Sequence, residues 1–307
     1  MKILISGGSG FIGRNLIPFL LQKYPHYQII NLDRREWLWE KKQYLYLNGD
    51  LRNEELLEKI FREHKPVTAV INLAYQKPLD LIQSAETNFC GQQILLEKAV
   101  AAKVKRFILV SRDLVYQQEE KEFSAPIQEN EKFYPPTLEA AHYQGREALA
   151  LAYEKEKKLP LIILRPAQLF GPGMSKEHLI YLLISNAMAN NFLPLPNEGK
   201  QKQDWLYIKD FLMAVDQSLH QKRPSFPILN LGRGQQFSLL EIAELILTQL
   251  DKEKSLIKFI SAPSNNLVTP PLDWSRAESA WGWRPQYSLA QGLQETIQWL
   301  KKHTLNQ

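Results

Sequence analysis

The order of segments in the sequence predicts an α/β protein, in which a doubly wound parallel sheet is followed by a smaller mixed α/β lobe. Two observations support this class. Short apolar segments alternate with longer amphipathic ones through the first half of the chain. These apolar segments also lack the polar–apolar alternation of half-exposed strands, which indicates strands covered by helices on both faces.

Five apolar segments of the first half are the predicted strands. They read KILIS (2–6), YQIINLD (27–33), VTAVINLA (67–74), RFILVS (106–111) and PLIILRP (160–166). Between them, apolar residues recur at helical spacing. This spacing predicts helices over 11–24, 53–64, 88–103 and 135–158.

After Gly173 the pattern changes to helices separated by longer loops. Helices are predicted over 178–191, 210–220 and 238–250. Ser238 stands where it can cap the last of them.

The change in pattern suggests where the chain divides. We predict a nucleotide-binding sheet domain over residues 1–170 and a substrate-binding lobe over 171–307. Within the lobe, an apolar segment is predicted to return to the main sheet as a strand near 228–231.

Composition limits the kinds of partner. Apolar residues make up 44% and charged residues 23% of the 307, which is ordinary for a globular protein. The net charge of +5 is dispersed along the chain, so no nucleic-acid partner is predicted. No apolar run approaches a membrane span and the N-terminal run is too short for a signal peptide, so we predict a cytoplasmic location and no membrane partner. The single cysteine, Cys90, is predicted to be a small buried residue, and no metal site is predicted.

A glycine-rich loop follows the first predicted strand. The segment ISGGSGFIGRN contains Gly8-x-Gly10-x-x-Gly13 and also Gly7-x-x-Gly10-x-x-Gly13. Glycines permit a tight turn and let backbone N–H groups approach phosphate oxygens, while the following helix adds its positive end. Between a strand and a helix, this pattern predicts a Rossmann-type site for the pyrophosphate of a dinucleotide.

The end of the second predicted strand indicates which dinucleotide. Asp33 lies 20 residues after Gly13 and can accept hydrogen bonds from a ribose diol, which favours NAD. Arg34 and Arg35 follow directly and can hold a 2′-phosphate, so NADP stays open as the alternative.

These motifs and later ones resemble, almost end to end, an extended short-chain dehydrogenase/reductase of the NAD-dependent epimerase/dehydratase type, a group that includes nucleotide-sugar epimerases and dehydratases. GGSGFIG resembles the family's cofactor loop, NGDLRN the segment that meets adenine, NLAY the strand end beside the cofactor, and LRPAQLFGPG the strand and loop that pass the nicotinamide. The family's helix beginning Asn-x-x-Gly implicates Asn88 as a structural or cofactor-side residue. The resemblance implies a cofactor site formed by Gly7, Gly10, Phe11, Ile12, Gly13, Asp33, Arg34, Asp50, Leu51, Leu73, Ala74 and Ser111.

Enzymes that resemble this chain react through a Ser/Thr, a Tyr and a Lys. The tyrosine is the acid/base, the lysine lowers its pKa and holds the nicotinamide ribose, and the Ser/Thr bonds the reacting oxygen. PPTLEAAHYQGRE aligns without gaps with the family pattern Pro-Pro-Ser-Pro-Tyr-Gly-x-Ser-Lys-x-x-x-Glu. Glu139 then stands at the tyrosine position and Tyr143 at the lysine position, while Arg112 in SRDLVY stands at the hydroxyl position.

Arg112, Glu139 and Tyr143 are therefore the predicted catalytic residues, and two interpretations stay open. One is a repurposed site, with Glu139 as base or Tyr143 as acid and Arg112 binding an anionic substrate group. The other is a relict whose groups only pair with one another. A Tyr-x-x-x-Lys does occur at Tyr153 and Lys157, at the end of the helix, and we interpret it as a chance surface match.

Three functions remain for test. The first is a divergent epimerase/dehydratase-like enzyme acting on a small, nucleotide-sugar or other anionic substrate. The second is a non-catalytic NAD(P)-binding sensor or scaffold, and the third is a cofactor-independent isomerase or cyclase. Gln203 replaces an arginine that helps hold the substrate diphosphate in proteins that resemble this one. By analogy alone, the fold implies a homodimer through the helices predicted over 88–103 and 135–158.

Overall fold

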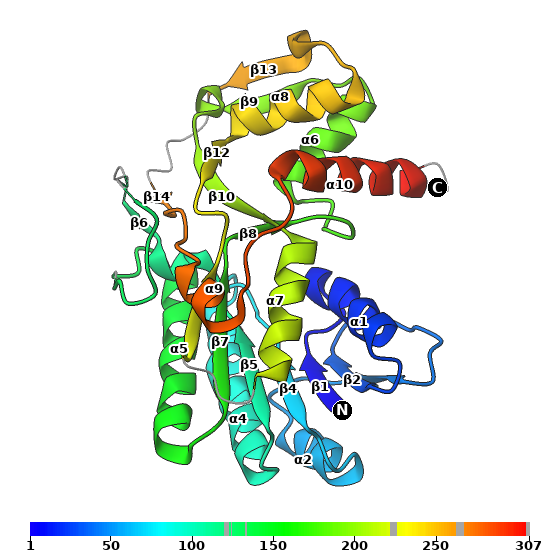
Figure 1. Ribbon diagram of the computed structural model, residues 1–307, viewed down its shortest axis with the longest axis vertical. Coiled ribbons are helices and arrows are strands. Elements are labelled where there is room, and N and C mark those ends of the chain that lie inside the picture. Colours follow the sequence, from blue (N-terminus) through cyan, green and yellow to red (C-terminus); the bar gives the residue numbers. More distant parts are fainter. Residues whose placement is uncertain (120–122, 124, 133, 222–225, 262–266, 305–307) are drawn as a thin grey trace.

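The computed structural model describes residues 1–119, 123, 125–132, 134–221, 226–261 and 267–304. A body built on a large sheet carries a smaller lobe, which stands at the top of Figure 1. In the described residues no helix combines the length and the apolar character that crossing a membrane requires.

The body contains seven parallel strands in the order β11-β7-β5-β4-β1-β2-β3. Their bounds are Lys2–Ser6 (β1), Gln28–Asp33 (β2), Tyr44–Asn48 (β3), Ala69–Asn72 (β4), Arg106–Val110 (β5), Leu161–Pro166 (β7) and Ile228–Leu231 (β11). Strands β2 and β3 follow one another on one side of β1. The chain then crosses back, and β4, β5, β7 and β11 follow one another on the other side of β1. The carboxyl ends of β1 and β4 therefore flank the crevice in which such sheets bind ligands. This architecture confirms the predicted fold class.

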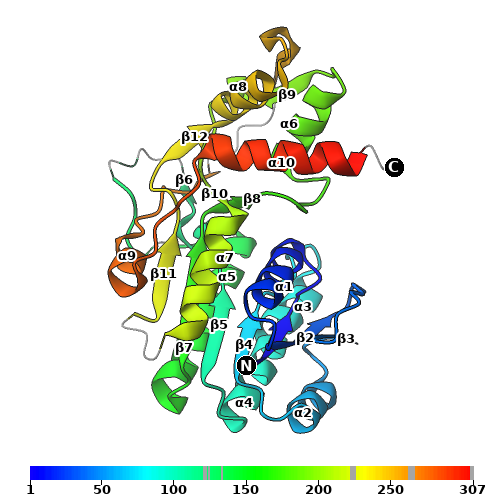
Figure 2. The same ribbon diagram turned by 45° about the vertical axis from the view of Figure 1, so that its right-hand side comes forward.

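Helices cover both faces of this sheet (Figure 2). They are Phe11–Lys23 (α1), Glu54–Glu63 (α2), Leu81–Ala85 (α3), Gln92–Ala101 (α4), Leu138–Lys157 (α5) and Ile208–His220 (α7). Helix α1 packs with α7, whereas α2 packs with α4 and α4 with α5. In β1, Ile3 and Ile5 point into one apolar cluster and Leu4 into the other, because successive strand residues face opposite sides.

The lobe is formed mostly by the second half of the chain. Its elements are Gln168–Phe170 (β8), Leu179–Met188 (α6), Leu193–Pro196 (β9), Lys202–Tyr207 (β10), Gln236–Ser238 (β12), Leu239–Leu250 (α8), Ile257–Ile260 (β13) and Leu289–Thr304 (α10). Ser238 caps α8 in a capping box with Glu241, as its position predicts. Not all of the later chain lies in the lobe, since α7 and β11 pack in the body.

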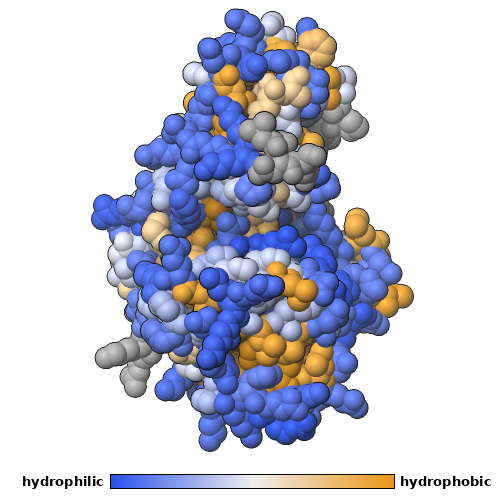
Figure 3. Space-filling model, turned by 90° about the vertical axis from the view of Figure 1, so that its right-hand side faces the viewer, coloured by the Kyte–Doolittle hydropathy of each residue, from blue (hydrophilic) through white to orange (hydrophobic). Residues whose placement is uncertain are grey.

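Further elements are short. Two of them, Asn197–Gly199 (η3) and Lys254–Leu256 (η4), belong to the lobe, where η3 packs with β9, β13 and α8. The others are Asp113–Tyr116 (η2), Gln118–Glu119 (β6), Leu267–Val268 (β14) and Ser275–Trp281 (α9), and α9 packs against β11 of the body. Strand β6 pairs with β14, and β8, which follows β7 in the chain, pairs with β10. The lobe is narrower than the body in Figure 3. The candidate site described below includes residues of η2 and of the lobe strands β8 and β10.

One side-chain prediction is wrong. Cys90 is exposed. It lies in a short π-helix, Glu86–Gly91 (η1), that precedes α4, and the residues of this turn that face inward are Thr87, Asn88 and Gly91. The wider turn rotates the cysteine to the outer side, which a regular helical period does not anticipate.

Candidate functional site

The glycine loop joins β1 to α1 at the centre of the sheet edge. Gly7 has a φ of +74°, and a Cβ at this residue would lie 2.7 Å from the backbone N and Cα of Ala74. A Cβ at Gly13 would lie 2.2 Å from the carbonyl oxygen of Gly8. Glycine at position 7 therefore lets the turn lie against the segment after β4, and glycine at position 13 lets α1 lie against the turn. This close packing is the arrangement that accepts a pyrophosphate.

Asp33 lies at the end of β2 with both carboxylate oxygens held by backbone groups. One oxygen accepts a hydrogen bond from the N–H of Ser9 at 2.9 Å, and the other accepts one from the N–H of Arg35 at 2.9 Å. The residue is only 8% exposed. Its orientation beside the glycine loop suits the ribose contact that its position predicts.

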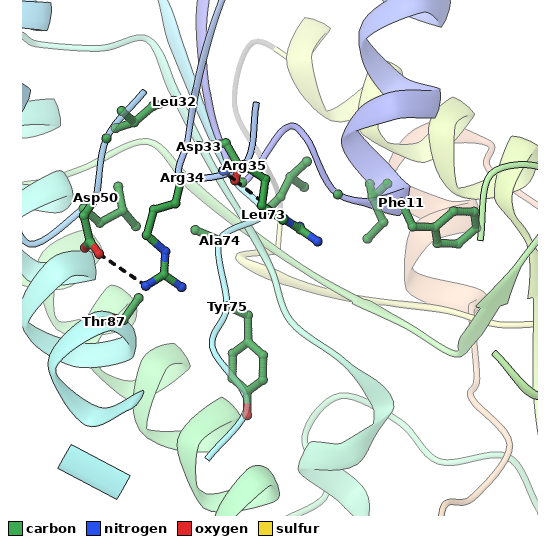
Figure 4. A pocket seen from close by; sticks show the side chains of 15 residues that line it. Phe11, Leu32, Asp33, Arg34, Arg35, Asp50, Leu73, Ala74, Tyr75 and Thr87 are labelled. Carbon is green, nitrogen blue, oxygen red and sulfur yellow. Dashed lines mark hydrogen bonds and ion pairs between the residues drawn. The ribbon is translucent and has the colours of Figure 1, made fainter. Parts of the chain in front are cut away.

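The two arginines that follow Asp33 have different partners. The Arg34 guanidinium donates to Asp50 at 3.5 Å (Figure 4) and to Gln76 at 3.2 Å, whereas Nε of Arg35 lies 3.8 Å from Oδ1 of Asp33. Burial acts to raise the pKa of Asp50, but hydrogen bonds from Arg52 outweigh it and hold the pKa below its usual value. Asp50 is thus an ionised partner that satisfies Arg34 at neutral pH.

A cavity of about 510 Å³ opens at this end of the sheet. It is lined by Gly7, Gly10, Phe11, Ile12, Leu32, Asp33, Arg34, Arg35, Gly49, Asp50, Leu51, Leu73, Ala74, Tyr75 and Thr87. All of the predicted cofactor residues line it except two. Gly13 packs beneath the loop, and Ser111 is buried outside the cavity with no hydrogen-bond partner for its hydroxyl among the described residues.

Asn88 also lies behind the cavity wall. Its side chain accepts from the N–H of Gln76 at 2.9 Å and donates to the carbonyl of the same residue at 2.7 Å. It is 3.0 Å from Nδ1 of His142 on α5. These contacts hold the segment after β4 in place, which agrees with the structural role that its position implies.

Arg112, Glu139 and Tyr143 come together although they belong to different elements. Nη1 of Arg112, just after β5, is 3.8 Å from Oε1 of Glu139 in the first turn of α5. The Arg112 guanidinium also lies close enough to the hydroxyl of Tyr143, one turn further along the helix, to act on its pKa. The side chains of Arg112 and Glu139 remain 31% and 29% exposed, so a ligand can reach both.

Tyr143 is enclosed by aromatic and cationic groups that the sequence did not predict. Its ring stacks on Tyr75, with centroids 4.2 Å apart and an interplanar angle of 15°. The guanidinium of Arg146 lies 5.5 Å from the Tyr75 ring centroid and 6.0 Å from that of Tyr143. Burial raises the pKa of Tyr143 to about 12, although Arg112 and Arg146 act to lower it. Tyr143 therefore stays protonated at neutral pH.

A second, smaller cavity lies on the other side of Arg112. Its volume is about 130 Å³. It is lined by Arg112, Asp113, Leu114, Gln117, Gln168, Gln201, Lys202, Gln203, Leu267, Val268 and Thr269. The Arg112 guanidinium donates to Oε1 of Gln168 at 2.6 Å across this space. Side-chain amides, a hydroxyl and two cations thus face a cavity between body and lobe.

Asp113 is a further polar group of this cavity. It is 3% exposed, and one carboxylate oxygen has no hydrogen-bond partner among the described residues. Burial raises the pKa of its carboxyl to about 6, while Arg112 acts to lower it. Its place next to Arg112 was visible in SRDLVY, but nothing in the sequence showed that the side chain would be buried in this way.

The Tyr-x-x-x-Lys at the end of α5 does not reach either cavity. The Tyr153 hydroxyl donates to Glu97 of α4, and its ring packs in the core on that side of the sheet. Lys157 is exposed in the last turn of the helix. The pair therefore takes no part in the candidate site.

Comparisons with known proteins agree with this geometry. A model described as the NAD dependent epimerase/dehydratase family matches residues 3–232. The dTDP-D-glucose 4,6-dehydratase of Bos taurus is 27% identical to the chain over 329 aligned positions, which cover 99% of this chain and 90% of that protein.

Two solved structures extend the comparison to three dimensions. A dTDP-glucose 4,6-dehydratase from Bacillus anthracis in complex with NAD has a TM-score of 0.89 at 30% identity and covers 98% of this chain and 97% of its own. The UDP-glucose 4-epimerase of Thermotoga maritima with UDP-glucose has a TM-score of 0.89 over 99% and 100% of the two chains. Its identity is 23%, so it shows a shared fold. The chain belongs to the NAD dependent epimerase/dehydratase family.

Proposed function

We propose that this chain is an NAD-binding enzyme that epimerises or dehydrates a nucleotide sugar, with Arg112, Glu139 and Tyr143 as its reacting groups. The contact among these three side chains, between two cavities, is the observation that carries the proposal. One cavity has the features of a dinucleotide site, and the other has a polar lining that suits a sugar. The similar dehydratase of Bacillus anthracis, whose structure holds NAD, supports the cofactor and the class of reaction.

The residues around the glycine loop fit NAD. Gly7 lets the turn lie against the backbone of Ala74, and Gly7 and Gly10 both line the cavity, so a pyrophosphate can approach the backbone N–H groups of the loop. Asp33 would accept hydrogen bonds from the adenosine ribose, and its charge would repel a 2′-phosphate. Arg34 already pairs with Asp50, which also favours NAD over NADP. When bound, NAD supplies reversible hydride exchange with a substrate carbon.

Arg112, Glu139 and Tyr143, called the trio below, can accept the proton of a sugar hydroxyl and stabilise the charge that develops on its oxygen. Glu139 is the only carboxylate of the trio, and it would accept the proton of a sugar hydroxyl. Arg112 would stabilise the negative charge that develops on that oxygen, because its N–H donors already point between the two cavities. Tyr143 would donate a hydrogen bond, since its raised pKa keeps it protonated.

The second cavity suits the sugar. Asp113, Gln168, Gln203 and Thr269 offer donors and acceptors for hydroxyl groups. Arg112 and Lys202 add positive charge for a phosphate or a carboxylate, so the missing family arginine at position 203 does not leave the cavity without cations.

Two alternatives make different predictions. A non-catalytic sensor or scaffold would bind NAD without turnover, but the similar proteins described above are named as enzymes. A cofactor-independent isomerase or cyclase would convert its substrate with no nicotinamide bound, and no specific contact favours it.

The first experiment is mass spectrometry of the small molecules released when the purified full chain is denatured. We expect NAD in near-stoichiometric amount. The protein is then incubated with dTDP-glucose or UDP-glucose, and the products are followed by mass and by NMR. Dehydration removes one water from the sugar, whereas epimerisation changes its stereochemistry at constant mass. Bound NAD with no conversion of any nucleotide sugar tried would favour the sensor.

Variants test the trio within the same assay. Glu139→Gln should lower kcat by about 100-fold or more, the usual contribution of a general base. Tyr153→Phe is the matched control on the same helix and should leave kcat within about twofold, because that hydroxyl contacts only the α4 side. If Glu139→Gln, Tyr143→Phe and Arg112→Ala all retain full activity, the trio is a relict.

A homodimer through α4 and α5 is proposed by analogy with proteins of this fold. Light scattering of the purified chain, at concentrations that span its working range, distinguishes a dimer from a monomer directly.

A further inference from the structure

Tyr75 stands between the two cavities. Its side chain lines the dinucleotide cavity and points away from Asp33 and Arg35 in Figure 4. The ring stacks on Tyr143, whose hydroxyl lies near the Arg112 guanidinium, and Arg112 lines the second cavity. The two cavities are therefore separated by a stack of two tyrosines.

The residues that line the first cavity account for only part of a dinucleotide. The glycine loop serves the pyrophosphate, Asp33 the adenosine ribose, and Asp50 and Leu51 the segment implied to meet adenine. None of the strand from Leu161–Pro166, which would pass the nicotinamide, is among the lining residues, nor is any member of the trio. The lining residues thus account for adenosine and two phosphates, and one of them, Tyr75, contacts the trio through Tyr143.

Opposing forces act on the stack. Ring stacking and the cation of Arg146 hold Tyr75 against Tyr143. Arg146 is itself fixed, because it donates to Oε1 of Gln92 and to the carbonyl of Ala74, both at 2.8 Å. Against this, the Tyr75 hydroxyl is buried and has no hydrogen-bond partner among the described residues. An unpaired buried hydroxyl favours any arrangement in which it reaches water.

We propose that Tyr75 is a specificity-determining residue of the dinucleotide cavity: its stack on Tyr143 closes the path from the pyrophosphate to Arg112, and a nicotinamide riboside comes beside Arg112 and Glu139 only when the stack opens. The proposal rests on the proposed function, because it assigns NAD as the ligand. ADP, which ends at the pyrophosphate, binds with the stack closed. NAD binds at the expense of the stack.

The test is the ratio of the dissociation constants of NAD and ADP, measured by calorimetry on the full chain. Tyr75→Ala removes the stack. It should lower this ratio by about two- to tenfold, because NAD binding no longer has to break the stack and ADP binding never did. Tyr75→Phe keeps the ring but removes the hydroxyl that gains water on opening, so it should raise the ratio by about fivefold. The two variants are therefore expected to move the ratio in opposite directions.

Tyr143→Leu provides a second route if Tyr75→Ala does not fold, because it removes the other ring and should also lower the ratio. A ratio within twofold of the wild type in Tyr75→Ala, or in Tyr143→Leu where that variant replaces it, overturns the proposal. If this happens while NAD binds and a nucleotide sugar is converted, the proposed function stands and only the role of Tyr75 falls. If neither NAD nor ADP binds the wild-type chain, both proposals fail together.

Discussion

Alanine at Gly7, compared with alanine at Gly282, should separate two costs in stability. One is the backbone strain of a left-handed residue, and the other is steric overlap with the backbone of Ala74, just after β4. Gly7 has a φ of +74°, and its Cβ would lie 2.7 Å from Ala74 Cα, about 0.8 Å short of ordinary carbon packing. Gly282 is a matched control, since its φ is +69° but no atom lies within 4 Å of the position of its Cβ. Both alanines share the left-handed strain, and only one meets a backbone.

The two effects have different sizes. Alanine in the left-handed region costs about 1–2 kcal/mol, which is the whole expected loss at Gly282. Overpacking adds about 1–3 kcal/mol at Gly7, for a total of about 2–5 kcal/mol. A chain of 307 residues has an unfolding entropy of about 0.6 kcal/mol per kelvin. The melting temperature should therefore fall by about 2–3 °C for Gly282→Ala and about 3–8 °C for Gly7→Ala.

Cofactor binding provides the second measurement. Leu73 and Ala74 line the dinucleotide cavity, so a shift of their backbone away from Gly7 should weaken NAD by at least about tenfold, or about 1.4 kcal/mol. Gly282 lies after α9, away from the cavity, and its variant should bind NAD as the wild type does. Differential scanning calorimetry and isothermal titration on both variants make the comparison. The reasoning is refuted if Gly7→Ala is no less stable than Gly282→Ala and binds NAD with unchanged affinity.

Three further predictions concern stability and pH. Glu147→Gln leaves the buried guanidinium of Arg165 without its carboxylate partner. The free energy of unfolding, measured with urea, should therefore fall by about 3–5 kcal/mol, and a fall below about 1 kcal/mol would contradict a tightly coupled pair. Burial raises the pKa of Asp113 to about 6, so between pH 4 and pH 6 the folded state keeps a proton that the unfolded state releases, and stability from this group falls as pH rises. Relative to Asp113→Asn, the wild type should lose about 2 kcal/mol between pH 4 and pH 7, and the same pH dependence in both proteins would speak against this. Ser238→Ala removes the capping box of α8 and should cost about 1 kcal/mol in thermal unfolding, whereas an unchanged melting temperature would mean that the box contributes nothing.

The cofactor half of the candidate site was largely predictable, because its signals are local. A strand, a glycine turn and a helix are consecutive in the chain, and the steric demands of the turn appear directly as glycines at positions 7, 10 and 13. The place of Asp33 beside this turn was predictable for the same reason, because it is the last residue of the next strand. Ser111 shows the limit, since its position next to β5 did not reveal that it would be buried and absent from the cavity lining.

The catalytic half was predictable in position but not in environment. Alignment with the family pattern identified Arg112, Glu139 and Tyr143, and the structure brings them into contact. Nothing in the sequence indicated that Tyr75 would stack on Tyr143, or that Arg146 would lie over both rings. These contacts join the end of β4 to the middle of α5, so they depend on how helix and sheet pack.

The alternation of strands and helices, the glycine turn and the acidic end of β2 could therefore be predicted from the sequence alone, and the resemblance to the family added Arg112, Glu139 and Tyr143 as candidates. These features follow from hydrophobic period, backbone sterics and residue identity, which act over a few neighbouring residues. Only the tertiary structure decided that Asp113 is buried, that Cys90 is exposed and that two tyrosines separate the cavities. Burial and stacking are set by groups from distant segments, whose distances exist only once the sheet has formed and its helices have packed.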